Sequence, residues 1–228
     1  MPKQFFMKLG DIAFWINSAK SDSSLAQMQK NSNLEESFNA LYKGSSDPWA
    51  CSDTKYRYQL LKYSKLIALL PKREYRKALD VGCGLGMMSR LLSPHIGEGL
   101  GIELSQVAVD NAEKLSHSFP NLSFKQGDIT KLSETAEGKY ELIVLADVLY
   151  YLSPLNDTSI KAIIQLVEDL LEPGGIVLIA NHFFFDLDPQ SAMVREIHAS
   201  FRWAKRLTLL HEDRQPFYLA SVLQKTDE

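Results

Sequence analysis

Cysteine, long basic runs and long apolar runs are scarce or missing in this 228-residue chain. Only two cysteines occur, Cys51 and Cys83, and we expect both to be free thiols in a reducing compartment. Lys and Arg number 25 against 28 Asp and Glu, a net charge of −3, so a nucleic acid is not an expected partner. No apolar segment reaches the roughly 20 residues that span a bilayer, which predicts no integral membrane association and a cytoplasmic location.

The N-terminal segment also lacks a secretory core, because Lys8 and Asp11 interrupt its apolar residues. Its aromatic content, which begins with Phe5-Phe6-Met7, leaves a contact with a membrane surface open. Residues 17–33 are poor in apolar groups and rich in Ser, Asn, Gln and Lys, so we expect a flexible connection or an exposed stretch there.

The Gly-Lys-Ser/Thr ending of a triphosphate-binding loop is missing as well, although the chain carries a glycine-rich turn. Gly82, Gly84 and Gly86 follow an apolar strand predicted over 77–82 and precede a predicted helix. Alternating glycines let a backbone turn sharply and pass close to a ligand, since no Cβ intervenes. A dinucleotide fingerprint needs glycine at its sixth place, where this chain has Met87, so a dinucleotide cofactor is disfavoured.

Two acids close to this turn indicate what it binds. Asp80, at the end of the strand, would face the ligand with a negative charge, which repels phosphate and suits a cation. Glu103 ends the second predicted strand about twenty residues later, where nucleotide-binding folds place the acid that takes a ribose diol. Each acid also has an ordinary structural reading, Asp80 as a turn residue and Glu103 as a helix-start residue. A cationic nucleoside such as S-adenosylmethionine fits this pattern.

Strands and helices alternate through most of the chain. One helix is predicted up to Pro71, and another, with Ile160 and Val167 on its apolar face, ends before Pro173. The predicted strands lie at 77–82, 98–103, 122–126, 140–146 and 175–181, with a closing pair at 201–210 and 216–223. This alternation predicts an α/β fold around a parallel sheet, whose strand ends gather on one rim where ligands bind.

Further motifs follow the glycine turn in a recognisable order: Gly127-Asp128-Ile129, then 140–151, then Leu171-Glu172-Pro173-Gly174-Gly175. In these motifs the chain resembles the class I S-adenosylmethionine-dependent methyltransferases, over roughly residues 72 to 182. The resemblance implies a Rossmann-like seven-stranded mostly parallel sheet with helices on both faces and an antiparallel edge hairpin. It divides the chain into a cofactor-binding domain at 72–228 and an N-terminal helical extension with a cofactor-covering lid at 1–71.

The resemblance implies S-adenosyl-L-methionine as the cofactor and assigns residues to it. Asp80 would lie near the ammonium, Glu103 would take the ribose, and Asp128 with Ile129 would meet the adenine, although an Asp after Gly is also a common turn residue. The full set predicted to bind the cofactor is Trp49, Tyr58, Lys62, Asp80, Gly82, Gly84, Gly86, Glu103, Leu104, Asp128, Ile129 and Ala146.

The residues after the fourth strand point to the acceptor. Nucleic-acid amino-methyltransferases carry an Asn-Pro-Pro-aromatic signature here, and Ala146-Asp147-Val148-Leu149 replaces it, so base methylation loses support. Asp147 would steer an amine, and Tyr150 or Tyr151 would shape the acceptor pocket or simply pack under a loop. His182, after the fifth strand, is either a general base or structural. Asp147, Tyr150 and His182 are the predicted catalytic residues.

Three segments precede the first strand: Asp47-Pro48-Trp49, 58–63 and 68–71. Together they are similar to the lead-in of the nodulation S-type N-methyltransferases, which methylate the amino group of a chitooligosaccharide. The likeness covers roughly residues 47 to 182 and departs at Gln59, where that family usually has Glu.

This second likeness implies that Trp49, Tyr58 and Lys62 fold over the cofactor, with Lys62 or Tyr58 reaching its carboxylate. Otherwise Trp49 is a hydrophobic plug and Lys62 a solvated charge. The sequence thus predicts a methyltransferase that acts on an amine of a small metabolite or amino sugar. Two alternatives stay open: O-methylation of a small hydroxylated acceptor, with base help from His182, and a protein that holds the cofactor without transfer.

Overall fold

The computed structural model describes residues 9–50, 57–152, 155–183 and 189–226. Cys51 and the aromatic residues Phe5 and Phe6 lie outside these ranges, whereas Cys83 is a buried free thiol. Among the described helices, none combines the length and the apolar character that crossing a membrane requires.

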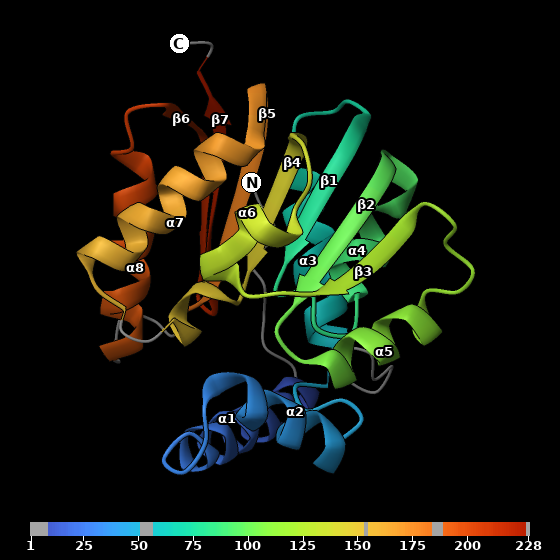
Figure 1. Cartoon of the computed structure of the whole chain (residues 1–228). Helices are drawn as coiled ribbons and strands as arrows, with labels where there is room; N and C mark the ends of the chain where they lie inside the picture. The colour runs from blue at the N-terminus through green and yellow to red at the C-terminus, as the bar shows by residue number, and fades with distance from the viewer. Residues whose placement is uncertain (1–8, 51–56, 153–154, 184–188, 227–228) are drawn as a thin grey trace.

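A seven-stranded sheet forms the centre of the molecule, in the order β3-β2-β1-β4-β5-β7-β6 (Figure 1). The strands from β1 to β5 are parallel, and β7 runs antiparallel to both β5 and β6. The predicted Rossmann-like sheet with an antiparallel edge hairpin is therefore confirmed. The strands are β1 Tyr75–Val81, β2 Ile96–Glu103, β3 Leu122–Gln126, β4 Tyr140–Ala146, β5 Leu171–His182, β6 Leu207–Gln215 and β7 Tyr218–Lys225.

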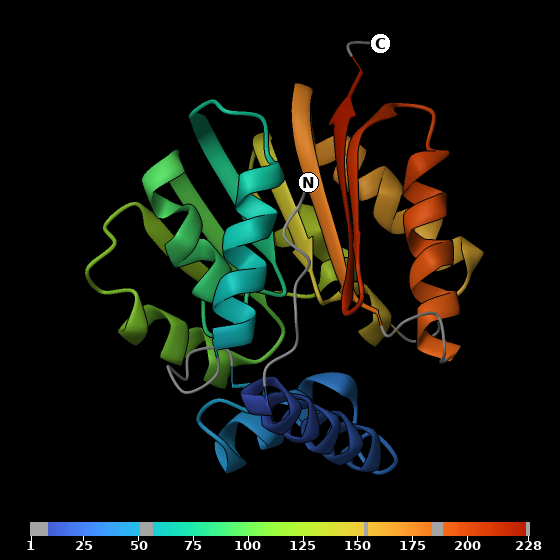
Figure 2. The ribbon, with the colours of Figure 1, turned by 180° about the vertical axis from the view of Figure 1, so that it is seen from behind.

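Helices cover both faces of this sheet, as the two opposite views show (Figures 1 and 2). One hydrophobic cluster joins the strands to α6, α7 and α8, and a second joins them to α3 and α4. The fifth helix packs against β2 and β3. The helix bounds are α3 Arg57–Leu69, α4 Met87–Leu92, α5 Gln106–Leu115, α6 Leu132–Thr135, α7 Asp157–Leu170 and α8 Pro189–Arg202.

The central strands and α7 show why this layering forms. Six of the seven β4 residues are buried, as expected for a strand covered on both faces. The apolar residues of α7 recur at helical spacing, so Ile160, Ile164 and Val167 face the sheet. Asn156 caps this helix, because its side chain accepts hydrogen bonds from the backbone N–H groups of Thr158 and Ser159, both at 3.0 Å.

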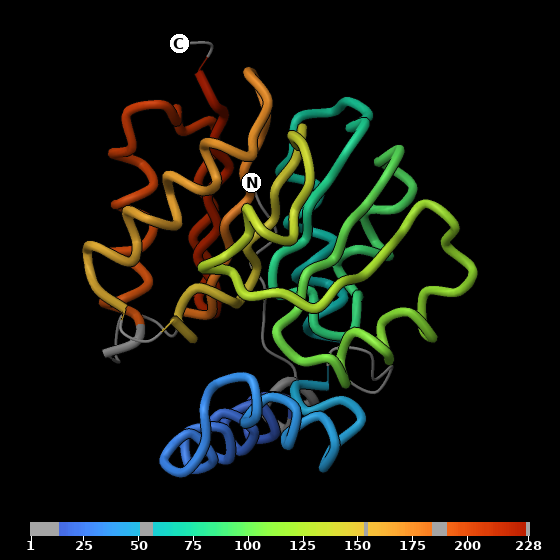
Figure 3. The backbone as a smooth tube through the Cα atoms, in the orientation of Figure 1, coloured from blue at the N-terminus to red at the C-terminus, as the bar shows by residue number. Residues whose placement is uncertain are grey.

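Two further helices, α1 Leu9–Met28 and α2 Leu34–Gly44, lie beyond one end of the sheet (Figure 3). Of the two alternatives predicted for residues 17–33, a flexible connection is wrong up to Met28, where α1 ends, whereas an exposed stretch agrees with the side chains, most of which are exposed. Among the described side chains of this helix, residues 14–28, most are exposed and only Phe14 and Leu25 are buried. These two lie about three turns apart on one side of the helix, a signal too sparse for a periodicity argument.

The closing strand pair also starts later than predicted. Residues 201–202 belong to α8, and β6 begins only at Leu207. Ile197 and Phe201 are fully buried four residues apart on α8, so their apolar character reflects a helical face. The second strand of the pair, β7, agrees closely with its predicted position.

Candidate functional site

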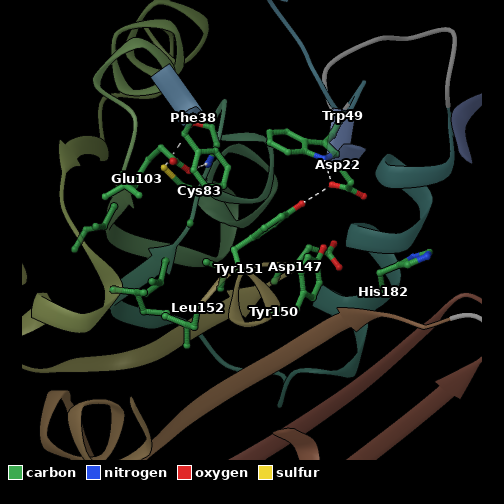
Figure 4. Close-up of a pocket in the computed structure, with 18 of the residues that line it drawn as sticks. Asp22, Phe38, Trp49, Cys83, Glu103, Asp147, Tyr150, Tyr151, Leu152 and His182 are labelled. Carbon is green, nitrogen blue, oxygen red and sulfur yellow. Dashed lines mark hydrogen bonds between the residues drawn. The ribbon is translucent and has the colours of Figure 1, made fainter. Parts of the chain in front are cut away.

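A cavity of about 740 Å³ opens at the edge where the parallel strands end (Figure 4). Residues that follow β1 to β5 line it from the sheet side, and residues of α1, α2 and α3 line it from the other side. Asn39 ties α2 to this edge, since its side-chain oxygen accepts hydrogen bonds from Ser105 Oγ at 2.8 Å and Val107 N at 3.3 Å. The strand-end rim and the N-terminal helices therefore enclose one site.

The glycine turn forms one wall. Its three glycines all have positive φ, and the Gly82 N–H donates to the Ile102 carbonyl at 2.8 Å, which fixes the turn against β2. Gly82 and Gly84 line the cavity. Gly86 is not in the wall: it is the residue before α4, and a Cβ there would lie 2.8 Å from the Phe124 ring. Two of the three predicted glycines are thus placed to approach a ligand.

Glu103 stands at the end of β2 in the same wall. Its carboxylate is 7% exposed and accepts hydrogen bonds from Gly84 N at 3.0 Å and Ser105 N at 3.1 Å. Burial raises the pKa of Glu103, and these backbone hydrogen bonds partly offset the rise. Leu104 follows it in the cavity lining. The carboxylate is therefore held rigidly beside the glycine turn, where the sequence predicts a ribose-binding acid.

Asp80 lies behind the turn and does not line the cavity. Its carboxylate is 5% exposed and accepts a hydrogen bond from Ser89 Oγ of α4 at 2.6 Å. Burial raises the pKa of Asp80 to about 6, with Ser89 opposing the rise and the charge of Glu103 adding to it. Because Asp80 does not line the cavity, its carboxylate would need a bridging group, such as a water molecule, to reach a ligand ammonium. Its role in cofactor binding stays a prediction.

Asp128 and Ile129 line the cavity just after β3, at the start of a short 3-10 helix, η2 Ile129–Lys131. Asp128 Oδ1 accepts hydrogen bonds from both the backbone N–H and the hydroxyl of Thr130, each at 2.8 Å. The turn-forming reading of Asp128 is therefore realised, and its place in the wall leaves it able to contact a ligand too.

The end of β4 brings together Ala146, Asp147 and Tyr150 in the lining, with Lys62 of α3 facing them. Lys62 Nζ forms an ion pair with Asp147 Oδ2. Asp147 Oδ1 is buried and accepts no hydrogen bond from the described residues. Burial raises the pKa of Tyr150 well above its ordinary value, so its phenol stays protonated and is available as a hydrogen-bond donor. Lys62 is therefore not a solvated charge. In this structure its partner is Asp147.

An aromatic wall closes the cavity on the N-terminal side (Figure 4). Asp22 Oδ1 accepts hydrogen bonds from Trp49 Nε1 and from the Tyr151 hydroxyl, both at 2.9 Å. Three segments far apart in sequence meet at this carboxylate: α1, the loop before α3, and the 3-10 helix η3 Leu149–Tyr151. Trp49 is therefore anchored through its indole N–H and is more than a hydrophobic plug.

His182 lies across the site from Glu103 (Figure 4), and Tyr58 contacts the same Trp15 ring as His182 does. The His182 ring is 4.0 Å from the Trp15 ring, centroid to centroid. Tyr58 is 2% exposed, packs against Phe14 and Trp15, and donates its hydroxyl to the Phe217 carbonyl at 3.3 Å. Both residues line the cavity, but the Tyr58 hydroxyl has a backbone partner of its own.

Sequence reasoning missed Asp22 and Trp15, which enter the site from α1. The stretch that holds Asp22 is polar and was expected to be a connection, so nothing local in the sequence marks it. The pair Phe14-Trp15 was the available signal, since adjacent aromatics in a polar helix need a partner surface.

The charges that line the described part of the cavity are strongly biased. They comprise five carboxylates and one lysine, which itself pairs with one of those carboxylates. The five acids are Asp22, Asp47, Glu103, Asp128 and Asp147. Such a lining attracts cations and disfavours anions.

The sequence profile of the family described as Nodulation protein S (NodS) matches residues 35–182. Among curated proteins, a malonyl-[acyl-carrier protein] O-methyltransferase of Halalkalibacterium halodurans is 32% identical over 156 residues, 66% of this chain and 53% of the relative. A nodulation protein S of Rhizobium tropici is 27% identical over 138 residues, 60% of this chain and 56% of the relative. The chain thus spans about half the length of these curated relatives.

Among solved structures, the N-methyltransferase NodS of Bradyrhizobium japonicum, in complex with S-adenosyl-L-homocysteine, is similar with a TM-score of 0.67. The similarity covers 92% of this chain and 98% of that one at 18% sequence identity. At this identity the likeness supports the fold. The profile match confirms the family that the lead-in and the glycine turn predicted.

A comparison of Gly82→Ala with Gly84→Ala tests the close approach at the turn. Both glycines have positive φ, so an alanine at either costs about 1–2 kcal/mol of backbone strain. At Gly82 the new Cβ would also lie 2.5 Å from Val148 Cγ2, whereas at Gly84 it would lie 3.2 Å from the Tyr42 hydroxyl. We expect Gly82→Ala to lower the free energy of unfolding more in urea titrations; equal losses would contradict the packing described.

The pH dependence of stability tests the burial of Asp80. Because burial raises the pKa of Asp80 from 3.8 to about 6, the folded protein keeps a proton that the unfolded chain loses within this window. The contribution of Asp80 to the free energy of unfolding therefore falls as the pH rises from 3.8 to about 6, by roughly 2–3 kcal/mol over the whole window. We expect the stability of Asp80→Asn relative to the wild type to rise across that window and then level off, while a pH-independent difference would argue against the buried charge.

Proposed function

The chain belongs to the Nodulation protein S (NodS) family, and on this premise we propose that it is an S-adenosylmethionine-dependent methyltransferase whose acceptor is an amine of a small molecule. The fold places a cavity at the carboxyl ends of a parallel sheet, the usual ligand position in this architecture. The curated relatives named above are one O-methyltransferase and one nodulation protein S, so they support the reaction class, and the acceptor is inferred from the cavity.

Several features of the cavity fit this cofactor. The turn at Gly82 and Gly84 offers backbone where any Cβ would intrude, and a buried carboxylate, Glu103, is held beside it. We propose that Glu103 holds the ribose, that Asp128 and Ile129 hold the adenine, and that the turn takes the methionine portion. The acidic lining suits a ligand with an ammonium and a sulfonium.

Further support comes from the other predicted cofactor residues. Leu104, Ala146 and Trp49 all line the cavity. Lys62 and Tyr58 also face the cavity, although each has a protein partner in this structure. Gly86 and Asp80 would act behind this wall, by shaping the turn and the start of α4.

When bound, the cofactor supplies an activated methyl group, so the protein's task is alignment and exclusion of water. Orientation of reacting groups alone contributes about 7–11 kcal/mol in well-aligned systems. Asp147 Oδ1 is a free acceptor for an N–H of the incoming amine, and it would hold the nitrogen with its lone pair unobstructed. Tyr150, Tyr151 and Trp15 also line the cavity, and we propose that they help to exclude water.

The observation that carries the amine assignment is the unpartnered Asp147 Oδ1 in a cavity with a surplus of carboxylates. An acceptor that presents a carboxylate, as the name of the malonyl O-methyltransferase implies for that relative, would need a cation to receive it. Among the described lining residues the single lysine, Lys62, is already paired. An N–H donor satisfies Asp147 without any such cation.

Transfer of a labelled methyl group tests the proposal directly. The purified chain is incubated with S-adenosylmethionine, labelled at the methyl, and with benzylamine, benzyl alcohol or benzoate, which differ only in the reacting group; a metabolite extract is run in parallel. We expect label in benzylamine and in amines of the extract. Label confined to benzyl alcohol, together with loss on His182→Ala, would support O-methylation instead, and cofactor binding without any labelled acceptor would indicate a binding protein.

A pair of isosteric variants separates the two halves of the site. Glu103→Gln removes the proposed ribose acceptor, so the affinity for S-adenosylhomocysteine should fall by about 1–3 kcal/mol in calorimetry, the usual cost of an unsatisfied buried partner. Asp147→Asn should leave that affinity nearly unchanged and slow transfer to the amine. The reverse pattern would contradict the division into a cofactor side and an acceptor side.

A further inference from the structure

The ion pair between Lys62 and Asp147 is an unusual feature of the cavity wall. Lys62 is 1% exposed, although it is a lysine in the middle of α3, and the Asp147 side chain is only 15% exposed. Buried pairs of this kind cost desolvation energy that their attraction barely recovers, so they are weak devices for stability. A role at the site explains the pair better than stability does.

The backbone holds Asp147 in a fixed orientation. Its φ is +57°, a left-handed conformation that non-glycine residues seldom adopt, and its N–H donates to the Ala180 carbonyl of β5 at 2.7 Å. Backbone strain of this sort persists where the surroundings enforce it, and it gathers at functional sites. The carboxylate is thus held from the sheet by its backbone and from α3 by Lys62.

The two carboxylate oxygens of Asp147 have different surroundings. Oδ2 is engaged by Lys62, whereas Oδ1 is buried and accepts no hydrogen bond within the described part of the chain. A buried acceptor without a partner costs about 1–3 kcal/mol. A ligand that donates to Oδ1 would recover this energy on binding.

We infer that Lys62 is a positioning residue for the acceptor nitrogen and acts through Asp147, not through the cofactor. This inference rests on the proposed function and assigns Lys62 a part in it. By engaging Oδ2, Lys62 leaves Oδ1 as the oxygen without a partner and balances the charge of the carboxylate. A neutral amine can then donate one N–H to Oδ1 and keep its lone pair for attack.

Only a cation can balance the negative charge of the buried Asp147 carboxylate, and Lys62 is that cation. An unbalanced buried carboxylate favours an ammonium as its partner, and an ammonium has no lone pair with which to attack a methyl group. A lysine of fixed position lowers this preference. Lys62 therefore selects the reactive form of the acceptor as well as its orientation.

The opposing reading is that Lys62 binds the carboxylate of the cofactor, as the sequence suggested. The two readings differ in what they expect of S-adenosylhomocysteine binding, which needs no acceptor. Calorimetry is therefore run on the wild type, Lys62→Met, Lys62→Arg, Asp147→Asn and the double variant, with Lys72→Met, an exposed lysine just after α3, as the matched control. Label transfer to benzylamine is measured on the same proteins.

If Lys62 acts through Asp147, the affinity of every variant for S-adenosylhomocysteine stays within about threefold of the wild type. Lys62→Met and Asp147→Asn each slow transfer by about tenfold or more, the double variant is no slower than either single variant, and Lys62→Arg recovers most of the rate. This non-additivity, together with the arginine rescue, is not expected of a merely structural lysine.

Two results would overturn the inference. One is an affinity for S-adenosylhomocysteine that falls about tenfold in Lys62→Met and equally in the double variant, which would place Lys62 on the cofactor. The other is multiplicative loss of transfer in the double variant, which would make the two residues independent. Absence of S-adenosylhomocysteine binding by the wild type would instead refute the proposed function itself. If Lys62→Met does not fold, the double variant, in which no charge is left unpaired, still provides both comparisons, because its affinity and its transfer rate can be set against those of Asp147→Asn.

Discussion

The parallel direction of β1 to β5 is the constraint on which the rest of the molecule depends. Because these strands run the same way, the chain leaves the sheet at a single edge five times, and each exit exposes backbone groups and a short loop there. The glycine turn, Glu103, Asp128, Asp147 and His182 are separated widely in sequence, yet each follows or ends one of these strands. The direction of the strands alone gathers them around one cavity.

The N-terminal helices depend on this edge in turn. Their own apolar cluster is small, and it is completed by Leu85, which follows β1, and by Ala108 of α5. Asp22 adds polar contacts to Trp49 and Tyr151 across the cavity. Several of the side chains that hold the N-terminal helices against the sheet edge therefore also line the cavity. A ligand in the cavity would contact these same side chains.

The sequence predicted the sheet well because central parallel strands are continuous apolar runs bounded by glycine, proline and acids; β3 and β4 agree with their predicted limits. It failed for α1, whose polar residues give no periodic signal and whose few buried residues meet partners from distant segments. The acids at the strand ends could be predicted as site residues from the sequence itself. The ion pair between Lys62 and Asp147 could not be predicted, because it depends on how α3 packs against the end of β4, which no local sequence pattern records.

Whether such a fold holds an amine or a carboxylate acceptor depends on the charged groups that line the acceptor side of its cavity. A class I sheet offers the same edge to either, and the groups that follow β4 and those that face them decide what can be held there. Among the described residues of the cavity wall, the single lysine, Lys62, is paired with Asp147. Asp147 Oδ1 therefore stays available as a hydrogen-bond acceptor, and no unpaired lysine is left to bind a carboxylate. A carboxylate acceptor would have to break that pair and face the remaining acids, whereas an N–H donor leaves the pair intact. If the proposed amine acceptor is correct, the buried pair disfavours a carboxylate acceptor as much as it favours the amine.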